Sequence, residues 1–296
     1  MSSVDIVLSG LFVSALRSAT PLLFALLGEC LTQRAGRINL GVEGQMLVGA
    51  AAGYGATALT GSPWLGLLAG ALAGALLSLV YALLTVPAAA NPFASGLAVW
   101  MLGFGLSAYA GTALVGLRIE GFEPLAWGLT PSIVLALALV PLIGLWLYRT
   151  RTGLRWRAVG ESPETARAAG ITPWVVIVSA IAVGGLLSGL GGAALSVDYT
   201  RTWAEGMTAG RGLVAVGLVI VARWNPWLAL PAALLFGAAE ALSLRLQTTD
   251  SAISAHLLHT LPYLTSLAVF AVTCLRLGAR RGDGGAPAGL KAVFDR

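Results

Sequence analysis

Charged side chains are scarce in this chain. Asp, Glu, Lys and Arg together make up 10% of its 296 residues, whereas soluble globular domains carry about 25%. Hydrophobic residues make up 57% of the chain, and its mean hydropathy is +0.84. These charged residues are too few to cover the surface of a water-soluble fold of this size. A soluble domain is therefore excluded, and lipid is the expected solvent.

Residues that commonly carry chemistry are also rare. Cys30 and Cys274 both lie in apolar runs, which argues against a disulfide framework or a zinc site. The chain lacks both the His-Glu-x-x-His pair and the Gly-x-x-x-x-Gly-Lys-Ser/Thr phosphate loop. We therefore expect no metal, no bound cofactor and no ATP hydrolysis by this chain. An intramembrane hydrolase using Ser188 with His256 or His259 is a weaker alternative, because Ser188 lacks the Gly-x-Ser-x-Gly spacing.

Long apolar runs fill most of the sequence. A helix needs about 20 residues to cross about 30 Å of hydrocarbon, so these runs predict an all-α, polytopic membrane protein with eight or nine transmembrane helices. The 38 glycines suit close packing of such helices. The runs are 6–31, 38–59, 64–85, 92–114, 131–148, 174–195, 210–221, 226–246 and 257–277. We expect a membrane domain over 1–278 and a disordered, polar cytosolic tail over 279–296.

Positive charges predict the orientation. When the basic stretch 149–167 is placed in the cytosol, most of the 18 Lys and Arg residues fall on that side. The amino terminus is then external and the carboxyl terminus cytosolic. The net charge of +5 is spread among the loops, so it indicates topology rather than nucleic-acid binding.

Two parts of the chain are weakly similar to each other. Residues 38–50 align with 205–217, and each block is followed by a helix start of the form Pro-Trp-Leu, at Pro63 and Pro226. The two blocks lie on opposite sides in the predicted topology. This pattern favours an inverted repeat, an arrangement that many transporters use to build a central path.

The basic loop 149–173 contains a short helix with marked ends. Ser162 suits the N-cap, Pro163 the first helical position, and Glu164 the positive end of the helix dipole. Gly170 can end the helix in a left-handed conformation. Capping alone does not identify a partner, so an ordinary surface helix remains an alternative.

A second motif lies at 36–49, with the sequence Gly-Arg-Ile-Asn-Leu-Gly-Val-Glu-Gly-Gln-Met-Leu-Val-Gly. It places Asn39 and Glu43 beside a predicted span, where a polar side chain is a functional candidate by default. The alternative is a cytosolic turn in which Glu43 pairs with Arg34 or Arg37. Similarly, Glu240 either lines a path or pairs with a neighbouring helix, and pairing is favoured because buried charges usually find a partner.

Both motifs resemble segments of ABC-importer permeases from the nucleoside and simple-sugar branch of the branched-chain-type permease family. The capped helix is similar to their coupling helix, which sits in a groove of the ATPase subunit. The 36–49 segment is similar to their Gly-x-x-Asn-[Ile/Leu]-Gly-x-Glu-Gly-x-Met motif. Together with the stretches 91–96, 208–212, 223–226 and 261–263, the resemblance covers about 16–263. Glu29 departs from it, since a small residue is expected there.

The resemblance implies a non-catalytic permease subunit that imports nucleosides or related sugar-containing solutes. A monosaccharide or branched-chain amino-acid permease is the alternative within the family, and a secondary transporter or an intramembrane hydrolase lies outside it. The implied partners are an ATPase subunit that binds ATP and Mg, a second identical or paralogous permease, and an extracytoplasmic substrate-binding lipoprotein. The implied location is the bacterial cytoplasmic membrane.

The resemblance also assigns candidate residues. Those expected to dock on the ATPase are Gly160, Glu161, Pro163, Ala166, Arg167 and Gly170. Those expected to line the substrate path are Asn39, Glu43, Asn91, Trp100 and Phe104. The two aromatic residues suit stacking against a nucleobase or a sugar ring.

Overall fold

The computed structural model describes residues 3–248, 254–279 and 285–290. Within these ranges the chain is helical and contains no strand. In chain order the elements are α1 (Ser3–Arg34), α2 (Val42–Thr60), α3 (Pro63–Thr85), α4 (Pro92–Gly111), η1 (Ala126–Gly128), α5 (Pro131–Arg149), α6 (Arg151–Glu161), α7 (Pro163–Ala168), α8 (Pro173–Ala193), the π-helical turn η2 (Ala194–Tyr199), α9 (Arg211–Val221), α10 (Pro226–Thr248) and α11 (Ala255–Ala279).

Seven of the described helices are long and apolar enough to cross a membrane, namely α1, α3, α4, α5, α8, α10 and α11. This confirms the all-α, polytopic architecture. Helix α2 has 19 residues and is also long enough, although it is not among the seven. Helix α9 has only 11 residues, and at about 1.5 Å per residue it covers about 16 Å, half of the hydrocarbon. The predicted span at 210–221 is therefore a half-length helix.

Proline marks the first residue of five long helices. Pro63, Pro92, Pro131, Pro173 and Pro226 begin α3, α4, α5, α8 and α10. Proline fits there because the first amide of a helix has no partner within the helix and because the fixed φ of proline suits the first turn. These local signals explain why the predicted and observed starts of the spans agree closely.

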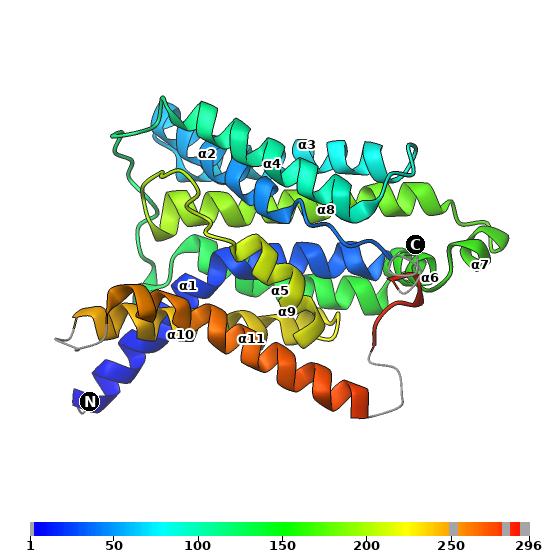
Figure 1. The fold of residues 1–296 in the computed structure, drawn as a ribbon. Helices are drawn as coiled ribbons and strands as arrows, with labels where there is room; N and C mark the ends of the chain where they lie inside the picture. The colour runs from blue at the N-terminus through cyan, green and yellow to red at the C-terminus, as the bar shows by residue number, and fades with distance from the viewer. Residues whose placement is uncertain (1–2, 249–253, 280–284, 291–296) are drawn as a thin grey trace.

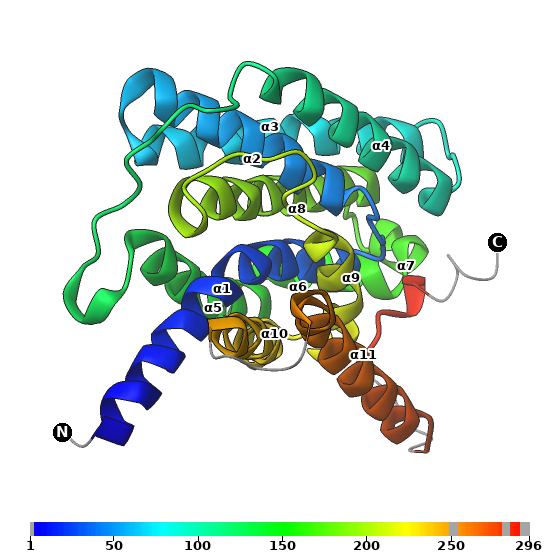
Figure 2. The same ribbon diagram turned by 60° about the vertical axis from the view of Figure 1, so that its left-hand side comes forward.

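Helices α1 and α8 lie side by side at the centre of the bundle (Figures 1 and 2). Helices α2, α3 and α4 lie on one side of this pair, and α5, α10 and α11 lie on the other. Helix α8 packs along α3, whereas α1 packs along α10. Both α3 and α10 begin with Pro-Trp-Leu and have 23 residues each. This reciprocal exchange of partners is the packing that an inverted repeat produces.

The α6–α7 loop lies at one end of the bundle, and the start of α1, the end of α10 and the start of α11 lie at the other (Figure 1). We call the end with α6 and α7 cytosolic, following the distribution of positive charge. Part of the predicted disordered tail is packed at this end, since Leu290 is only 4% exposed. Residues 280–284 and 291–296 of that predicted tail lie outside the described residues.

Glycine brings α2, α3 and α8 into main-chain contact. A Cβ atom added at Gly189 would lie 2.2 Å from the carbonyl oxygen of Gly70, and one at Gly49 would lie 2.3 Å from that of Gly189. The hydrophobic effect does not drive helices together in lipid. Their association therefore depends on van der Waals contact at such close approaches. The three-helix contact therefore leaves no room for a side chain at these positions.

We expect Gly189→Ala to lower the free energy of unfolding by about 1–3 kcal/mol, because the added methyl group must push α3 away. Gly105→Ala on α4 is the matched control, since its Cβ would have no neighbour within 4 Å. Thermal unfolding of the two purified variants in detergent measures the difference. Equal stability of the two would contradict the packing argument.

Candidate functional site

Two non-helical segments interrupt the bundle, 35–41 before α2 and 200–210 before α9. The second starts beyond η2, at the outer end of the α8 span. It ends where α9 begins. Helix α9 then runs to the cytosolic end, because Trp224, which follows it, accepts a hydrogen bond at its carbonyl from Arg34 Nε at the end of α1, at 2.7 Å. Since α9 covers about half of the hydrocarbon, it begins near mid-depth. The 200–210 segment therefore folds back into the membrane.

Glu43, in the first turn of α2, receives this re-entrant segment. Its Oε1 accepts hydrogen bonds from Thr208 Oγ1 at 2.5 Å and from the Gly210 amide at 2.8 Å. Its Oε2 accepts one from the Gly212 amide at 2.6 Å. The amides at a helix N-terminus carry partial positive charge, which suits a carboxylate. Glu43 is 3% exposed, so its carboxylate is buried inside the bundle against the start of α9.

Glu29 on α1 holds the other non-helical segment. Its Oε1 accepts hydrogen bonds from the Asn39 amide and from Gln33 Nε2, each at 3.0 Å. Gln33 Oε1 in turn accepts one from Trp224 Nε1 at 2.7 Å. An acidic residue at position 29 needs a local partner, and the main chain of 35–41 provides it. The same network reaches the end of α9.

The predicted path residues divide into two groups. Asn39 and Glu43 are buried at the 35–41 break, and the main chain of Trp100 on α4 is 2.8 Å from where a Cβ at Gly44 would lie. Phe104, one turn further along α4, is 42% exposed. Its ring lies 3.7 Å from a Cβ built at Gly206 of the re-entrant segment. Four of the five residues therefore surround the two breaks.

Asn91 lies apart from these four, at the cytosolic end of α4. Its Oδ1 accepts hydrogen bonds from the amides of Phe93 at 2.9 Å and Ala94 at 3.1 Å. Asn91 is therefore the N-cap of α4. This capping role is enough to explain the asparagine before Pro92, so no contact with a solute is needed to account for it.

Sequence reasoning missed Gln45 and gave Thr208 no role. Within the described residues, both polar atoms of the Gln45 side chain and the Nδ2 atom of Asn39 are buried without a hydrogen-bond partner. Such groups provide hydrogen-bonding capacity that water or a solute can use. Gln45 belongs to the 36–49 motif, and Thr208 to the matched stretch 208–212, so the resemblance already contained both positions.

Two other polar side chains have structural partners. Glu240 on α10 forms an ion pair with Arg211 and accepts a hydrogen bond from Ser18 Oγ at 2.6 Å, which confirms the pairing interpretation. It thereby ties the first residue of α9 to α10 and α1. Ser188 donates to the carbonyl of Gly184 in its own helix at 2.8 Å, the ordinary role of a helical serine.

The capped helix in the cytosolic loop is confirmed as α7. Ser162 Oγ accepts a hydrogen bond from the Thr165 amide at 3.2 Å, Pro163 is the first helical residue, and Gly170 has φ of +77°. A further helix, α6, precedes it, and the sequence did not predict α6 as a helix distinct from α7. Its buried residues are Gly153, Trp156, Val159 and Gly160. Their helical spacing is the signal that could have revealed α6.

The expected docking residues differ in exposure. Glu161, Pro163, Arg167 and Gly170 are exposed. Gly160 and Ala166 are buried, so they pack the loop onto the bundle.

Gly160 joins three chain segments. A Cβ there would lie 2.0 Å from the Arg34 carbonyl at the end of α1. A Cβ at Gly289 would lie 2.6 Å from the Gly160 carbonyl, and the Ala288 amide donates to Glu161 Oε2 at 3.1 Å. The α6–α7 loop is therefore in direct contact with both α1 and the carboxyl-terminal segment.

This architecture, a helical membrane bundle with a mid-depth break and a capped cytosolic loop, is typical of a transport subunit. Residues 11–273 match the family described as the branched-chain amino acid transport system / permease component. The chain belongs to this family. No solved structure matches it.

Several curated proteins are similar over most of the chain. A putative glucose ABC transporter permease from Haloferax volcanii is 36% identical, covering 90% of this chain and 92% of its own length. A guanosine ABC transporter permease from Bacillus subtilis is 30% identical, with 80% and 83% covered. A nucleoside ABC transporter permease from Lactococcus lactis is 29% identical, with 90% and 92% covered. The chain is thus a non-catalytic, multi-pass ABC transporter permease of the cytoplasmic membrane.

We expect Glu43→Gln to lower the free energy of unfolding by about 3 kcal/mol. The NH2 group of glutamine cannot accept a hydrogen bond, so main-chain donors at the start of α9 lose an acceptor. Trypsin should also cleave the 200–210 segment faster. Glu123→Gln, an exposed carboxylate in an outer loop, is the matched control. Unfolding in detergent and timed proteolysis measure both effects, and wild-type behaviour of Glu43→Gln would rule out the anchoring role.

Proposed function

We propose that this chain forms the translocation path of an ATP-driven importer for nucleosides or related sugar-containing solutes. The observation that carries the proposal is the re-entrant segment held by Glu43 at mid-depth. Discontinuous helices at this depth are where transporters place their substrate sites. The names of the relatives refer to glucose, guanosine and nucleosides, and a polyhydroxylated ring is common to all three.

The groups around the break suit such a ring. The unpartnered Nδ2 atom of Asn39 and the unpartnered side-chain amide of Gln45 can exchange hydrogen bonds with hydroxyl groups when the bundle opens. Trp100 and Phe104 on α4 offer aromatic surface for stacking against a base or a sugar face. An external binding lipoprotein would deliver the solute, so the permease itself needs only modest affinity. A second permease subunit would complete the path.

We further propose that α7 docks on a partner ATPase that binds ATP and Mg²⁺. Arg167 is exposed on α7, and the loop contacts the end of α1 through Gly160. Helix α1 also carries Glu29 and Gln33, which hold the break at 35–41 and the end of α9. Movement of the loop therefore has a short, rigid route to both breaks, which supports ATP-coupled alternation of access.

Substrate class is tested by uptake into proteoliposomes that contain this permease, its ATPase, its partner permease and its binding protein. We expect ATP-dependent uptake of labelled nucleoside, reduced by excess unlabelled nucleoside and not by leucine. Glucose is the second labelled solute, since one relative bears its name. Uptake of glucose without nucleoside would assign the monosaccharide alternative, and uptake of leucine alone would overturn the sugar-containing class.

Docking is tested by Arg167→Glu. Reversing an exposed charge at a protein interface typically weakens association by 1 kcal/mol or more, about fivefold to tenfold. We expect less ATPase to co-purify and substrate-stimulated ATP hydrolysis to fall, with normal membrane insertion. Arg151→Glu, an exposed arginine at the start of α6, is the control. Unchanged co-purification and coupling in Arg167→Glu would remove α7 from the interface.

A further inference from the structure

The re-entrant segment ends in a tight turn over 208–211, directly before α9. The Arg211 amide donates to the Thr208 carbonyl at 3.0 Å, and the two central residues, Ala209 and Gly210, have φ of +49° and +85°. Positive φ at both central positions is characteristic of a type I′ turn. Glycine adopts positive φ freely, whereas in alanine the Cβ atom crowds the following carbonyl oxygen. Ala209 therefore keeps this conformation only because the surrounding structure holds it.

Two side chains from different helices hold the peptide unit between Ala209 and Gly210. The amide of this unit belongs to Gly210 and donates to Glu43 Oε1 on α2 at 2.8 Å. Its carbonyl belongs to Ala209 and accepts a hydrogen bond from the Tyr263 hydroxyl group on α11 at 2.7 Å. The amide and the carbonyl of a peptide unit point in opposite directions, so α2 holds the turn from one side and α11 from the other. Rotation of this peptide plane breaks both hydrogen bonds.

The position of Tyr263 along α11 matches the depth of the turn. Helix α11 begins at Ala255 at the outer end of the bundle (Figure 1), and Tyr263 lies about 12 Å further along its axis, near mid-depth. The Tyr263 ring packs edge-on against Phe236 of α10, with the ring centroids 5.7 Å apart. Ala209 is exposed on the bundle, and lipid offers its carbonyl no donor. Tyr263 supplies that donor.

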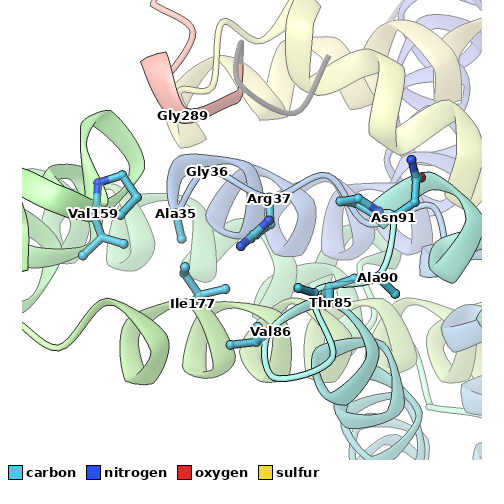
Figure 3. Close-up of a pocket in the computed structure, with 13 residues that line it drawn as sticks. Ala35, Gly36, Arg37, Thr85, Val86, Ala90, Asn91, Val159, Ile177 and Gly289 are labelled. Atoms are coloured by element: carbon cyan, nitrogen blue, oxygen red, sulfur yellow. The ribbon is translucent and has the colours of Figure 1, made fainter. Parts of the chain in front are cut away.

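Tyr263 is separate from the cytosolic opening of the bundle. A cavity of about 400 Å³ lies there, between the 35–37 segment, the α3–α4 connection and the α6–α7 loop (Figure 3). None of its described wall residues belongs to the 208–211 turn or to α11. A substitution at Tyr263 therefore changes the support of the mid-depth break and leaves the walls of this cavity unchanged.

We propose that Tyr263 is a positioning residue for transport. Its hydroxyl group holds the 208–211 turn in the orientation in which the mid-depth break meets the solute, and it acts through the Ala209 carbonyl without touching the solute itself. The proposal rests on the proposed function only in placing the solute at this break. The turn and its two hydrogen bonds do not depend on which solute is carried.

The transport test compares Tyr263→Phe with the double variant Tyr263→Phe/Ala209→Gly in the reconstituted transporter. The substrate is whichever labelled solute the wild-type transporter carries. Loss of one such hydrogen bond should raise the KM for uptake about fivefold, with the maximal rate little changed. Glycine at position 209 needs no support for positive φ, so the double variant should recover the wild-type KM. Tyr109→Phe, at an 82% exposed tyrosine on α4, is the matched control and should keep the wild-type KM.

Hydrogen–deuterium exchange of the full-length protein in nanodiscs measures the turn without any solute. We expect faster exchange across 205–212 in Tyr263→Phe, and a return to the wild-type rate in the double variant. If the wild-type transporter carries neither nucleoside nor glucose, the proposed function fails, and the exchange result still decides whether Tyr263 holds the turn.

Three results would overturn the proposal. Unchanged exchange in Tyr263→Phe would show that the hydroxyl group does not hold the turn. Faster exchange with an unchanged KM would reduce Tyr263 to a structural residue. A raised KM that Ala209→Gly does not restore would mean that Tyr263 acts by another route than the conformation of the turn.

Discussion

Main-chain amides that leave a helix inside a bilayer must find partners within the protein, since lipid offers none. Glu43 meets this requirement for the start of α9, and Glu29 meets it for the amide of Asn39. Glu43 lies on α2, outside the 200–210 break, whereas Glu29 lies on α1, directly before the 35–41 break. The two breaks, the half-length α9 and the mid-depth position of the site therefore all depend on these two buried acids.

Helix α1 connects this site to the cytosolic surface. In its last turns, Glu29 accepts a hydrogen bond from the main chain of the first break. Gln33 and Arg34 both bind Trp224 at the end of α9, Gln33 through the indole N–H and Arg34 through the main-chain carbonyl. The same end of α1 lies against Gly160 of the α6–α7 loop with no space for a Cβ atom. A small displacement of the loop cannot be absorbed by loose packing, because glycine-mediated contacts are rigid. This contact is the physical basis on which the proposed docking is linked to access.

Several features could be predicted from the sequence because their signals are local. The prolines at the starts of α3 and α8, and the Ser162 cap of α7, act within one helical turn. The ion pair of Glu240 was predicted as a type of contact, because an isolated charge in a membrane is unfavourable, but its partner Arg211 was not. The span expected at 210–221 proved to be half-length, because hydropathy does not show where the preceding loop turns back.

By itself, the sequence determined a polytopic helical bundle and its capped loop, because hydrophobic length and capping residues act over short stretches of chain, and its charge asymmetry predicts the orientation. It also contained the residues of the site within recognisable motifs. Only the tertiary structure decided what those residues do. Glu43 meets Thr208 and Gly212 across 165 and 169 residues of chain. Such a contact follows from how α2 and α9 pack against each other, and no local pattern encodes that packing.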